Sequence, residues 1–199
     1  TRRALAVLVD GMGYDLLTAR SGHAPFLRTL LPTARRLYCG FPSTTATSMG
    51  TFGTGLPPGS HGLVGFEVVD PDRDVVFNEL SWEDGPEPSR WQPYETVFEA
   101  VAGAGIPVTR IGPGFFDGSG LTNSALRGGR FVAARTLEER CDAAVTALSE
   151  ADRGLTYLYW GDLDKTGHVH GAASWQWGEE LTAIDGALQR CVEALPAGT

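Results

Sequence analysis

The sequence has little of what several common protein classes require. Its three cysteines, Cys39, Cys141 and Cys191, are an odd number, are far apart and include no C-x-x-C pair. They therefore make a poor disulfide framework, and we expect buried thiols in a reducing compartment. On this basis we expect a cytoplasmic protein, with secretion left open.

Long apolar runs and excess positive charge are also missing. No apolar run is long enough to cross a bilayer, so we expect no membrane partner. The apolar run after the first two arginines resembles a short secretion signal, but it ends in Asp10 rather than in small residues, and we interpret it as a buried strand. The net charge of −8 argues against binding to a nucleic-acid polymer. A small anionic ligand stays open, because bound cations can reverse the local field.

Three familiar nucleotide and nucleophile motifs are absent as well. The G-x-G of residues 10–15 lacks the third glycine of a dinucleotide-binding turn, and residues 53–62 lack the Lys-Ser/Thr of a P-loop. There is no G-x-S-x-G elbow. What remains is a chain of 199 residues, 42% hydrophobic and 20% charged, which can bury a core within one domain.

The pattern of the chain predicts an α/β fold. Apolar runs typical of strands occupy residues 4–10, 35–41, 106–112 and 154–162, and the first suits a central strand covered on both faces. Helices are expected within 11–32, from about 46–53, and at 94–105, 136–152 and 174–195, whereas 113–129 is expected to be a long loop. The alternation predicts a mostly parallel central sheet with helices on both faces, in a single domain covering 1–199. A hairpin of residues 66–70 and 74–80 predicts a small insertion at 66–90, over the site.

Helix-forming detail supports two of these segments. The helix after Thr136 has a threonine N-cap with Glu138 and Glu139 in its first turn. The helix at 94–105 is expected to pack through Val97, Phe98 and Val101.

Acidic residues follow two of the expected strands. Asp10 ends the first, and Asp162 and Asp164 follow the run at 154–160. Sites in open α/β sheets form beyond the carboxyl ends of strands, although a helix cap is an equally good explanation for Asp10 alone. Asp164 and His168 are four residues apart, and carboxylate plus imidazole is a typical zinc ligand pair. Asp162 and His170 are the competing ligands.

Residues 40–55 hold an unusual density of hydroxyl groups. The stretch GFPSTTATSMGTFGTG contains seven serine and threonine side chains. A polar linker is the simple explanation; the alternative is that one hydroxyl is a nucleophile. Because a hydroxyl is a weak nucleophile near neutral pH, a base or a metal must activate it, and no histidine in the stretch is an obvious base. A metal held by Asp10 could do so.

Together these segments resemble the alkaline phosphatase superfamily, and within it the type I phosphodiesterase/nucleotide pyrophosphatase family. The resemblance is carried by VLVDGMG, FPSTTATSMGTFGTGLPPGSHGLVG and YLYWGDLDKTGHVHG, in that order. The family places its nucleophile nine residues before the Thr of T-G-x-x-P-x-x-H-G. Counting back from Thr54 reaches Thr45, with Thr44 as the near rival.

The resemblance implies further roles. Asp10 and Thr45 would bind one zinc, and Asp164 and His168 the other. Ser48 stands where eukaryotic relatives have an asparagine that binds a phosphate oxygen, so Ser48 and Thr44 are the expected substrate-binding residues. Sulfatases share the fold but need C-x-P-x-R or S-x-P-x-R, which CGFPST does not provide.

The family pattern also has a later Asp-His pair and a final histidine, which this sequence does not contain. We therefore expect a longer natural protein that continues past Thr199 with an apolar strand and these ligands. The 199 residues alone should bind zinc weakly and hydrolyse little.

The expected activity is metal-dependent hydrolysis of phosphoric esters, of the phosphodiester or pyrophosphate type. Thr45 would form a phosphoryl- or nucleotidyl-threonine, with two zinc ions about 3.5–4 Å apart stabilising the attacking and leaving oxygens. The expected partner is a small phosphate ester or nucleotide. A phosphonate hydrolase or phosphomutase on the same scaffold is one alternative. A non-catalytic phosphate- or metal-binding fragment is the other.

Overall fold

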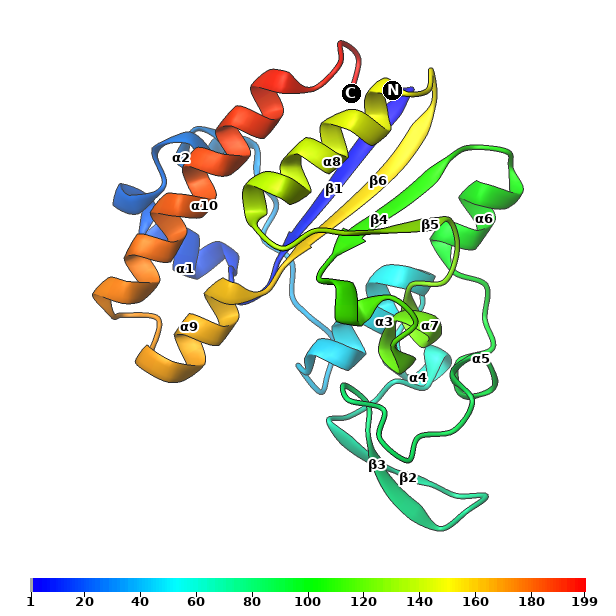
Figure 1. Ribbon diagram of the computed structural model, residues 1–199. Coiled ribbons are helices and arrows are strands. Elements are labelled where there is room, and N and C mark those ends of the chain that lie inside the picture. Colours follow the sequence, from blue (N-terminus) through cyan, green and yellow to red (C-terminus); the bar gives the residue numbers. More distant parts are fainter. Residues whose placement is uncertain (1) are drawn as a thin grey trace. The chain divides into compact units, whose positions relative to one another are not determined.

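The apolar runs of the sequence form a central sheet. The computed structural model describes residues 2–199, and its main sheet has four strands: β1 (Arg3–Val9), β4 (Val108–Gly112), β5 (Arg130–Ala133) and β6 (Gly154–Trp160). Their order in the sheet is β1-β6-β4-β5 (Figure 1). β1 and β6 are parallel, with Arg3 opposite Gly154 and Val9 opposite Trp160. Helices flank this parallel sheet, which confirms the predicted α/β class.

β1 differs from the expectation in one respect. It stands at the end of the strand order and pairs with β6 alone among the described strands, whereas its apolar run predicted a central strand. None of its seven residues is fully buried. An apolar run indicates that both faces of a strand are covered, but it does not determine how many strands pair with it.

Contacts between residues group the chain into two compact units. Unit 1 contains the chain up to Leu37, Thr109–Gly112 and Phe131–Thr199, and unit 2 contains Tyr38–Val108 and Pro113–Arg130. We describe each unit separately.

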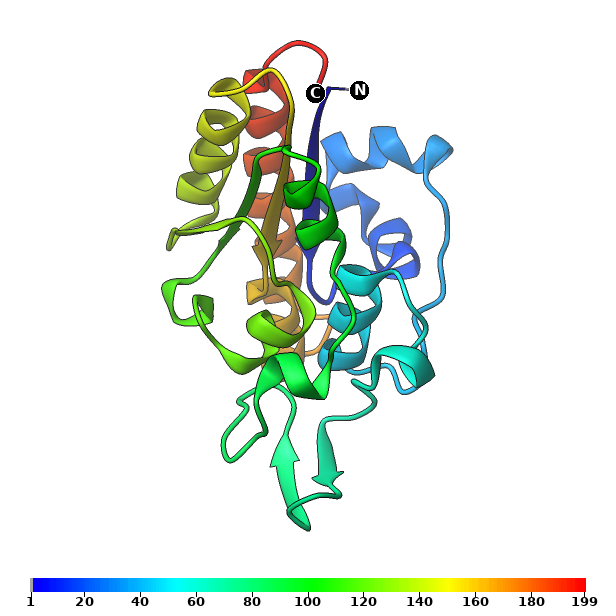
Figure 2. The ribbon, with the colours of Figure 1, turned by 90° about the vertical axis from the view of Figure 1, so that its right-hand side faces the viewer.

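Unit 1 holds the main core. Its helices are α1 (Tyr14–Ala19), α2 (Pro25–Leu30), α8 (Leu137–Ser149), α9 (Asp162–His170) and α10 (Trp175–Ala194), with short 3₁₀ turns at Ser21–His23 and Leu31–Thr33. α8 packs on β6 and β1, and α10 packs on α8, α9 and α2. The largest fully buried side chains of this unit include Trp177, Leu158, Leu163 and Leu181. Figure 2 shows the start of β1 beside the last turn of the chain, where Arg3 Nη1 donates to Ala197 O at 3.3 Å.

Buried polar contacts fix α2 on α10. The Asp185 carboxylate, on α10, accepts the backbone N–H groups of Phe26 and Leu27 at 3.0 and 2.7 Å. These are N–H groups of the first turn of α2, which have no partner inside the helix, so Asp185 satisfies them and complements the helix dipole.

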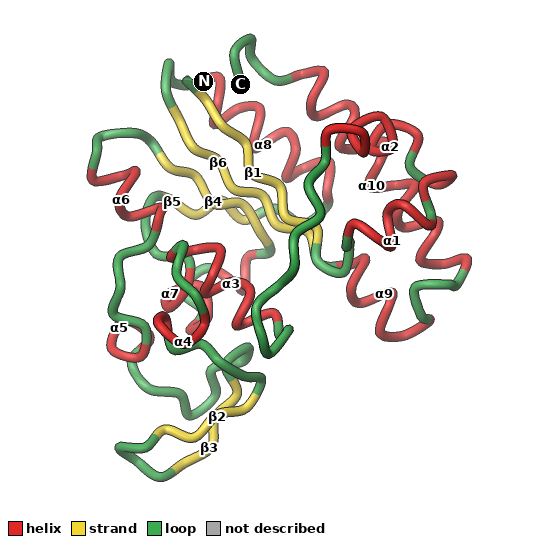
Figure 3. The backbone as a smooth tube through the Cα atoms, turned by 180° about the vertical axis from the view of Figure 1, so that it is seen from behind, coloured by secondary structure: helices red, strands yellow, loops and turns green. Residues whose placement is uncertain are grey.

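Unit 2 is built from short elements. It contains α3 (Thr45–Thr54), α4 (Pro58–His61), α5 (Pro88–Trp91), α6 (Val97–Gly103), a 3₁₀ turn at Gly114–Phe116 and α7 (Gly120–Ala125). α3 packs against α7, α4 and α6. β2 (Glu67–Asp70) and β3 (Val75–Asn78) form the predicted antiparallel hairpin, a two-stranded sheet drawn as two yellow segments in Figure 3.

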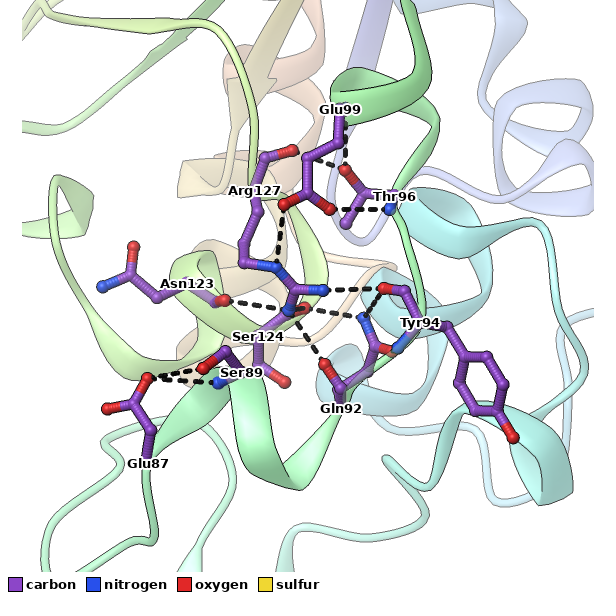
Figure 4. A network of polar contacts seen from close by, with 9 residues as sticks. All are labelled: Glu87, Ser89, Gln92, Tyr94, Thr96, Glu99, Asn123, Ser124 and Arg127. Carbon is purple, nitrogen blue, oxygen red and sulfur yellow. Dashed lines mark hydrogen bonds and ion pairs between the residues drawn. The ribbon is translucent and has the colours of Figure 1, made fainter. Parts of the chain in front are cut away.

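Arg127 ties three segments of unit 2 together (Figure 4). Its Nη1 donates to the carbonyls of Gln92, Asn123 and Ser124 at 2.9, 3.2 and 2.8 Å, and its Nη2 donates to Tyr94 O at 2.7 Å. Its Nε donates to the Glu99 carboxylate at 3.2 Å. Since the guanidinium is largely buried and its donors are used, this network is structural rather than a binding site.

The N-cap predicted at Thr136 is confirmed, and the structure shows a second cap, at Thr96, that was not predicted. Thr136 and Glu139 form a reciprocal capping box at the start of α8. Thr96 and Glu99 form the same box at α6. On α6, however, Phe98 is buried, whereas Val97, in its first turn, is 42% exposed and is not part of the packed face.

Three other expectations are wrong. Residues 35–41 form no strand; Leu37, Tyr38 and Phe41 are exposed there, because apolar content cannot supply a neighbouring strand to pair with. Cys39 is exposed, although Cys141 and Cys191 are buried as expected. The predicted loop at 113–129 contains α7, whose N-cap Ser119 accepts the Thr122 N–H. β5 went unrecognised because only four residues form it.

Among the described residues, no helix combines the length and the apolar character needed to cross a membrane.

Candidate functional site

Asp10 follows the last residue of β1, as the sequence predicted. Its backbone N–H donates to Trp160 O at 2.8 Å and so continues the ladder between β1 and β6. Its carboxylate is held from both sides: Gly11 N–H donates to Oδ1 at 3.0 Å, and the Tyr159 hydroxyl donates to Oδ2 at 2.9 Å. Two fixed donors therefore orient one carboxylate at the carboxyl end of the sheet.

Gly11 brings this carboxylate close to the start of α9. Its φ of +76° lies in the left-handed region, and a Cβ atom there would stand 2.6 Å from the Cα atom of Asp164. Only glycine allows both the turn and this approach. The turn after β1 and the first turn of α9 are thus in direct contact within unit 1, with Asp10 and Asp164 at that contact.

Asp164 and His168 lie on α9 and face one another. His168 Nε2 is 3.4 Å from Asp164 Oδ2, the distance expected for side chains four residues apart on a helix. Asp162 is the first residue of α9 and is exposed, and His170 is its last and is also exposed. Because residues two apart on a helix point to different sides, Asp162 does not share the face of Asp164.

The Asp10 carboxylate is partly buried and lies near a second negative charge, that of Asp164. Burial raises the pKa of Asp10 above its ordinary value, and the negative charge of Asp164 raises it further, while the hydrogen bond from Tyr159 opposes both effects. Burial also raises the pKa of Tyr159, so this hydroxyl keeps its proton and remains a donor. A cation beside the two carboxylates would offset their repulsion and favour the ionised form.

The donor set of α9 fits part of a zinc shell. A carboxylate and an imidazole are ordinary zinc ligands, and their atoms lie close enough to converge on one ion. In the part of the chain that the structure describes, no three His, Cys, Asp or Glu side chains form a group that could hold a metal. A zinc ion needs three or four ligands, and this pair on α9 could provide at most two of them.

Thr45, in unit 2, is the first residue of α3. Its side chain is half-buried, and no hydrogen bond joins its hydroxyl to another described residue. The N–H groups of Thr45 and Ala46 belong to the first turn, which has no intrahelical acceptors. A free hydroxyl and free N–H groups at the positive end of a helix are suited to a phosphate group.

Thr44 has a different position. It is the N-cap of α3, and its Oγ1 accepts the Thr47 N–H at 3.3 Å. The same oxygen donates its proton to Gly65 O at 2.9 Å and lies 2.9 Å from Thr47 Oγ1. Since Thr44 has one hydroxyl proton and Gly65 O takes it, Thr47 is the donor in the hydroxyl pair. The proton of Thr44 is engaged, whereas that of Thr45 is not.

Ser48 follows Thr45 by three residues on α3. Residues three apart share a face of a helix, so Ser48 lies on the same side as Thr45, one turn on. Its hydroxyl has no hydrogen-bond partner among the described residues.

His61 is buried with 1% of its surface exposed, which leaves no access for a substrate. Leu63 N–H donates to its Nδ1 at 3.1 Å, so the neutral ring carries its proton on Nε2, which donates to Thr51 Oγ1 at 3.0 Å. Burial lowers the pKa of His61 below its ordinary value. The His61 ring lies against α3 at Gly50, which has no side chain. A Cβ at Gly50 would stand 2.5 Å from His61 Cε1. His61 therefore fixes α3 to the segment after α4.

Sequence reasoning missed two residues around these groups. Tyr159 holds Asp10, and its place one residue before the end of β6, beside β1, was the available signal. Glu79 is fully buried in unit 2, and the signal was an acidic residue within an apolar stretch.

Comparison with known proteins identifies the class to which this fold and these residues belong. The family model described as type I phosphodiesterase/nucleotide pyrophosphatase matches residues 4–199, nearly the entire chain. The chain belongs to that family, which is part of the alkaline phosphatase superfamily. Among proteins of curated function, none matches the chain in sequence.

Solved structures share the fold. Murine ectonucleotide pyrophosphatase/phosphodiesterase 5, as an inactive variant with alanine in place of a threonine and in complex with AMP, matches with a TM-score of 0.73 and 20% identity over 98% of this chain. The same murine enzyme without that change matches with a TM-score of 0.71 and 19% identity over 96%. The human enzyme matches with a TM-score of 0.68 and 22% identity over 96%. The match covers 52%, 51% and 51% of those chains, so this chain spans about half their length.

Proposed function

We propose that this chain carries the nucleophile and part of the metal ligands of a hydrolase that cleaves phosphoric esters of the phosphodiester or pyrophosphate type. Family membership supports phosphoric ester hydrolysis as the general chemistry. The observation that carries the finer proposal is the hydroxyl of Thr45, which is free at the first position of α3, at the place where the motif count puts the nucleophile.

In the proposed reaction, the Thr45 oxygen attacks phosphorus in line with the leaving oxygen. A bond forms between Thr45 Oγ1 and phosphorus, the bond from phosphorus to the leaving oxygen breaks, and that oxygen takes up a proton. Water then attacks the phosphoryl- or nucleotidyl-threonine and restores the hydroxyl. In this proposal the N–H groups of Thr45 and Ala46, in the first turn of α3, bind a phosphate oxygen, and Ser48 on the same face is the side-chain donor.

Zinc, when bound, would lower the pKa of the attacking hydroxyl and stabilise charge on the phosphate oxygens. Asp10, Asp164 and His168 are the proposed ligands from unit 1. Asp164 and His168 are favoured over Asp162 and His170 because they face each other across one turn of α9. The role of Tyr159 and Gly11 is to hold the Asp10 carboxylate in one orientation.

We propose a nucleotide or another small phosphate ester as the substrate. The murine relative is in complex with AMP in a form described as inactive and carrying an alanine in place of a threonine. Both details support a nucleotide-type ligand and an essential threonine for this chain.

The test is turnover of an aryl phosphodiester by the full-length protein with zinc supplied. Thr45→Ala should abolish turnover, because the attacking oxygen is removed, and Thr45→Ser should keep measurable activity, because the hydroxyl survives. Ser60→Ala, an exposed position of α4 in the same motif, is the matched control and should keep the parent rate. Parent-level turnover by Thr45→Ala would refute the assignment.

A further inference from the structure

Glu79 is a buried carboxylate that the proposed chemistry does not use. It follows β3 directly, and none of its surface is exposed. Its own N–H donates to Phe66 O at 2.9 Å, which closes the hairpin beyond the paired residues of β2 and β3. No arginine, lysine or histidine forms an ion pair with it among the described residues, so its partners must be N–H groups.

Three N–H groups converge on this carboxylate. Val64 N–H and Gly65 N–H donate to Oε2 at 3.1 and 2.9 Å, and Trp91 Nε1–H donates to Oε1 at 3.0 Å. Trp91 is itself held edge-on against Phe77 of β3, with ring centroids 5.0 Å apart. Such a carboxylate fixes the peptide before Gly65, because both N–H groups must point at one oxygen.

The same glycine is the contact of the N-cap of α3. Gly65 O accepts the hydroxyl proton of Thr44 at 2.9 Å, and Thr44 Oγ1 accepts the Thr47 N–H at the start of the helix. A continuous path therefore runs from Trp91 and Glu79 through Gly65 to Thr44, which is bonded directly to Thr45. Every member of this path belongs to unit 2.

We propose that Glu79 is a positioning residue for Thr45, acting through Gly65 and the hydroxyl of Thr44. The proposal rests on the function proposed for Thr45. Glu79 holds the acceptor that fixes the Thr44 hydroxyl, and the Thr44 hydroxyl fixes both the start of α3 and its own proton. The backbone of Thr45 is then held in one conformation. Of the two threonines, Thr44 has its hydroxyl bonded to Gly65 O, and Thr45 has its hydroxyl free to react.

Glu79→Gln is a sharp probe because its geometry forces a conflict. One of the two oxygens becomes an NH₂ group, which then faces either the N–H groups of Val64 and Gly65 or the N–H of Trp91. Two donors face each other in either case. Trp91→Phe removes one of these donors and keeps an aromatic ring against Phe77, so the pair Glu79→Gln/Trp91→Phe can keep an amide oxygen on Val64 and Gly65 without the conflict.

The experiment measures kcat and KM for an aryl phosphodiester in the full-length protein. We expect Glu79→Gln to lower kcat by about 10–100-fold with little change in KM, since misplacement of a reacting group acts on the chemical step. Adding Trp91→Phe should restore part of kcat, although it removes more of the core. Thr44→Val should lower kcat similarly, and Glu79→Gln/Thr44→Val should be no worse than the poorer single variant, because both break one path.

Controls separate this proposal from the one on which it rests. Glu83→Gln, an exposed carboxylate of the same segment, should keep the parent kcat. Inactive Thr45→Ala together with parent-level kcat in Glu79→Gln would overturn the role of Glu79 alone, whereas active Thr45→Ala would overturn the nucleophile. If the kcat losses of Glu79→Gln and Thr44→Val multiply in the double variant, Glu79 does not act through Thr44 and its role is only structural. The same conclusion follows if adding Trp91→Phe to Glu79→Gln restores no kcat. If Glu79→Gln fails to fold, Glu79→Asp replaces it, because aspartate keeps the charge on a shorter side chain. The proposal then requires the same loss of kcat in Glu79→Asp and the same non-additivity with Thr44→Val.

Discussion

At the scale of single residues, hydrogen bonding distinguishes the hydroxyl groups of the adjacent Thr44 and Thr45. Thr44 has one proton and gives it to Gly65 O, while its oxygen accepts from Thr47. Thr45 has the same side chain, but its hydroxyl makes no hydrogen bond to another described residue. Removing a proton from Thr44 would leave the Gly65 carbonyl without its donor, whereas removing one from Thr45 costs no internal hydrogen bond.

His61 shows the opposite case, a titratable side chain whose function is structural. Because Leu63 N–H occupies its Nδ1, protonation of that nitrogen would break a buried hydrogen bond. Burial lowers the pKa of His61 in the folded protein below the ordinary value of 6.5. The unfolded chain therefore binds a proton near pH 6.5 that the folded protein does not bind, and folding loses free energy as the pH falls through that range.

We predict that the free energy of unfolding has a component from His61 that is fully present above pH 6.5 and is lost as the pH falls toward the folded pKa. Urea titrations between about pH 7.5 and 5 measure it. In His61→Asn, whose side-chain oxygen can still accept the Leu63 N–H, the acid-dependent loss should be smaller than in the parent. Equal pH slopes for the two proteins would contradict this account of His61.

At the scale of elements, the contact between the turn after β1 and α9 brings two acidic residues together. A left-handed residue other than glycine costs about 1–2 kcal/mol, and the short distance from the position of a Gly11 Cβ to the Asp164 backbone adds to it. The contact is backbone against backbone, so it cannot be relieved by rotating a side chain.

We predict that Gly11→Ala lowers zinc affinity at least about 10-fold, as expected when the support of a ligand is displaced, and also lowers the midpoint of thermal unfolding. Gly13→Ala is the matched control two residues away. A Cβ at Gly13 meets nothing within 4 Å, so zinc affinity should stay near that of the parent, although Gly13 is the N-cap of α1 and alanine there lowers the unfolding midpoint slightly. Zinc titration and thermal unfolding of the full-length proteins provide the comparison. Unchanged zinc affinity in Gly11→Ala would show that this contact does not organise the ligands.

Elements were predictable from the sequence where local signals agreed with long-range contacts. The threonine N-cap at Thr136, with glutamates in the first turn, predicted α8, and an apolar run predicted β6, because cap chemistry and hydrophobic pattern are local properties. Residues 35–41 have the composition of a strand and form none, since a strand needs a neighbour that composition does not reveal. α7 was hidden by the glycines and turn signals around it.

At the scale of the whole molecule, the sequence predicts candidate chemical groups but not the residues that support them. The prediction of Asp10, Thr45, Asp164 and His168 rests on the resemblance to the family. Tyr159, Gly11 and Glu79 act through contacts across 149, 153 and up to 15 positions of the chain. No local pattern encodes such pairs, and only the packing of strands and helices brings them together.

The protein has a net charge of −8, and the proposed substrate is an anion. Binding therefore requires a local positive potential at the site. Free N–H groups at the start of α3 provide one source, and a bound cation would provide a stronger one. The chain covers about half the length of the solved relatives.

The central claim, that Thr45 is the nucleophile, is tested most directly by trapping the covalent intermediate. The full-length protein is mixed with an aryl phosphodiester, quenched in acid within milliseconds to seconds, digested and analysed by mass spectrometry. The account predicts a phosphoryl or nucleotidyl group on Thr45 in the parent protein and no such group on the same peptide of Thr45→Ala. A label on Thr44 instead, or label on Thr45→Ala at the parent level, would contradict it.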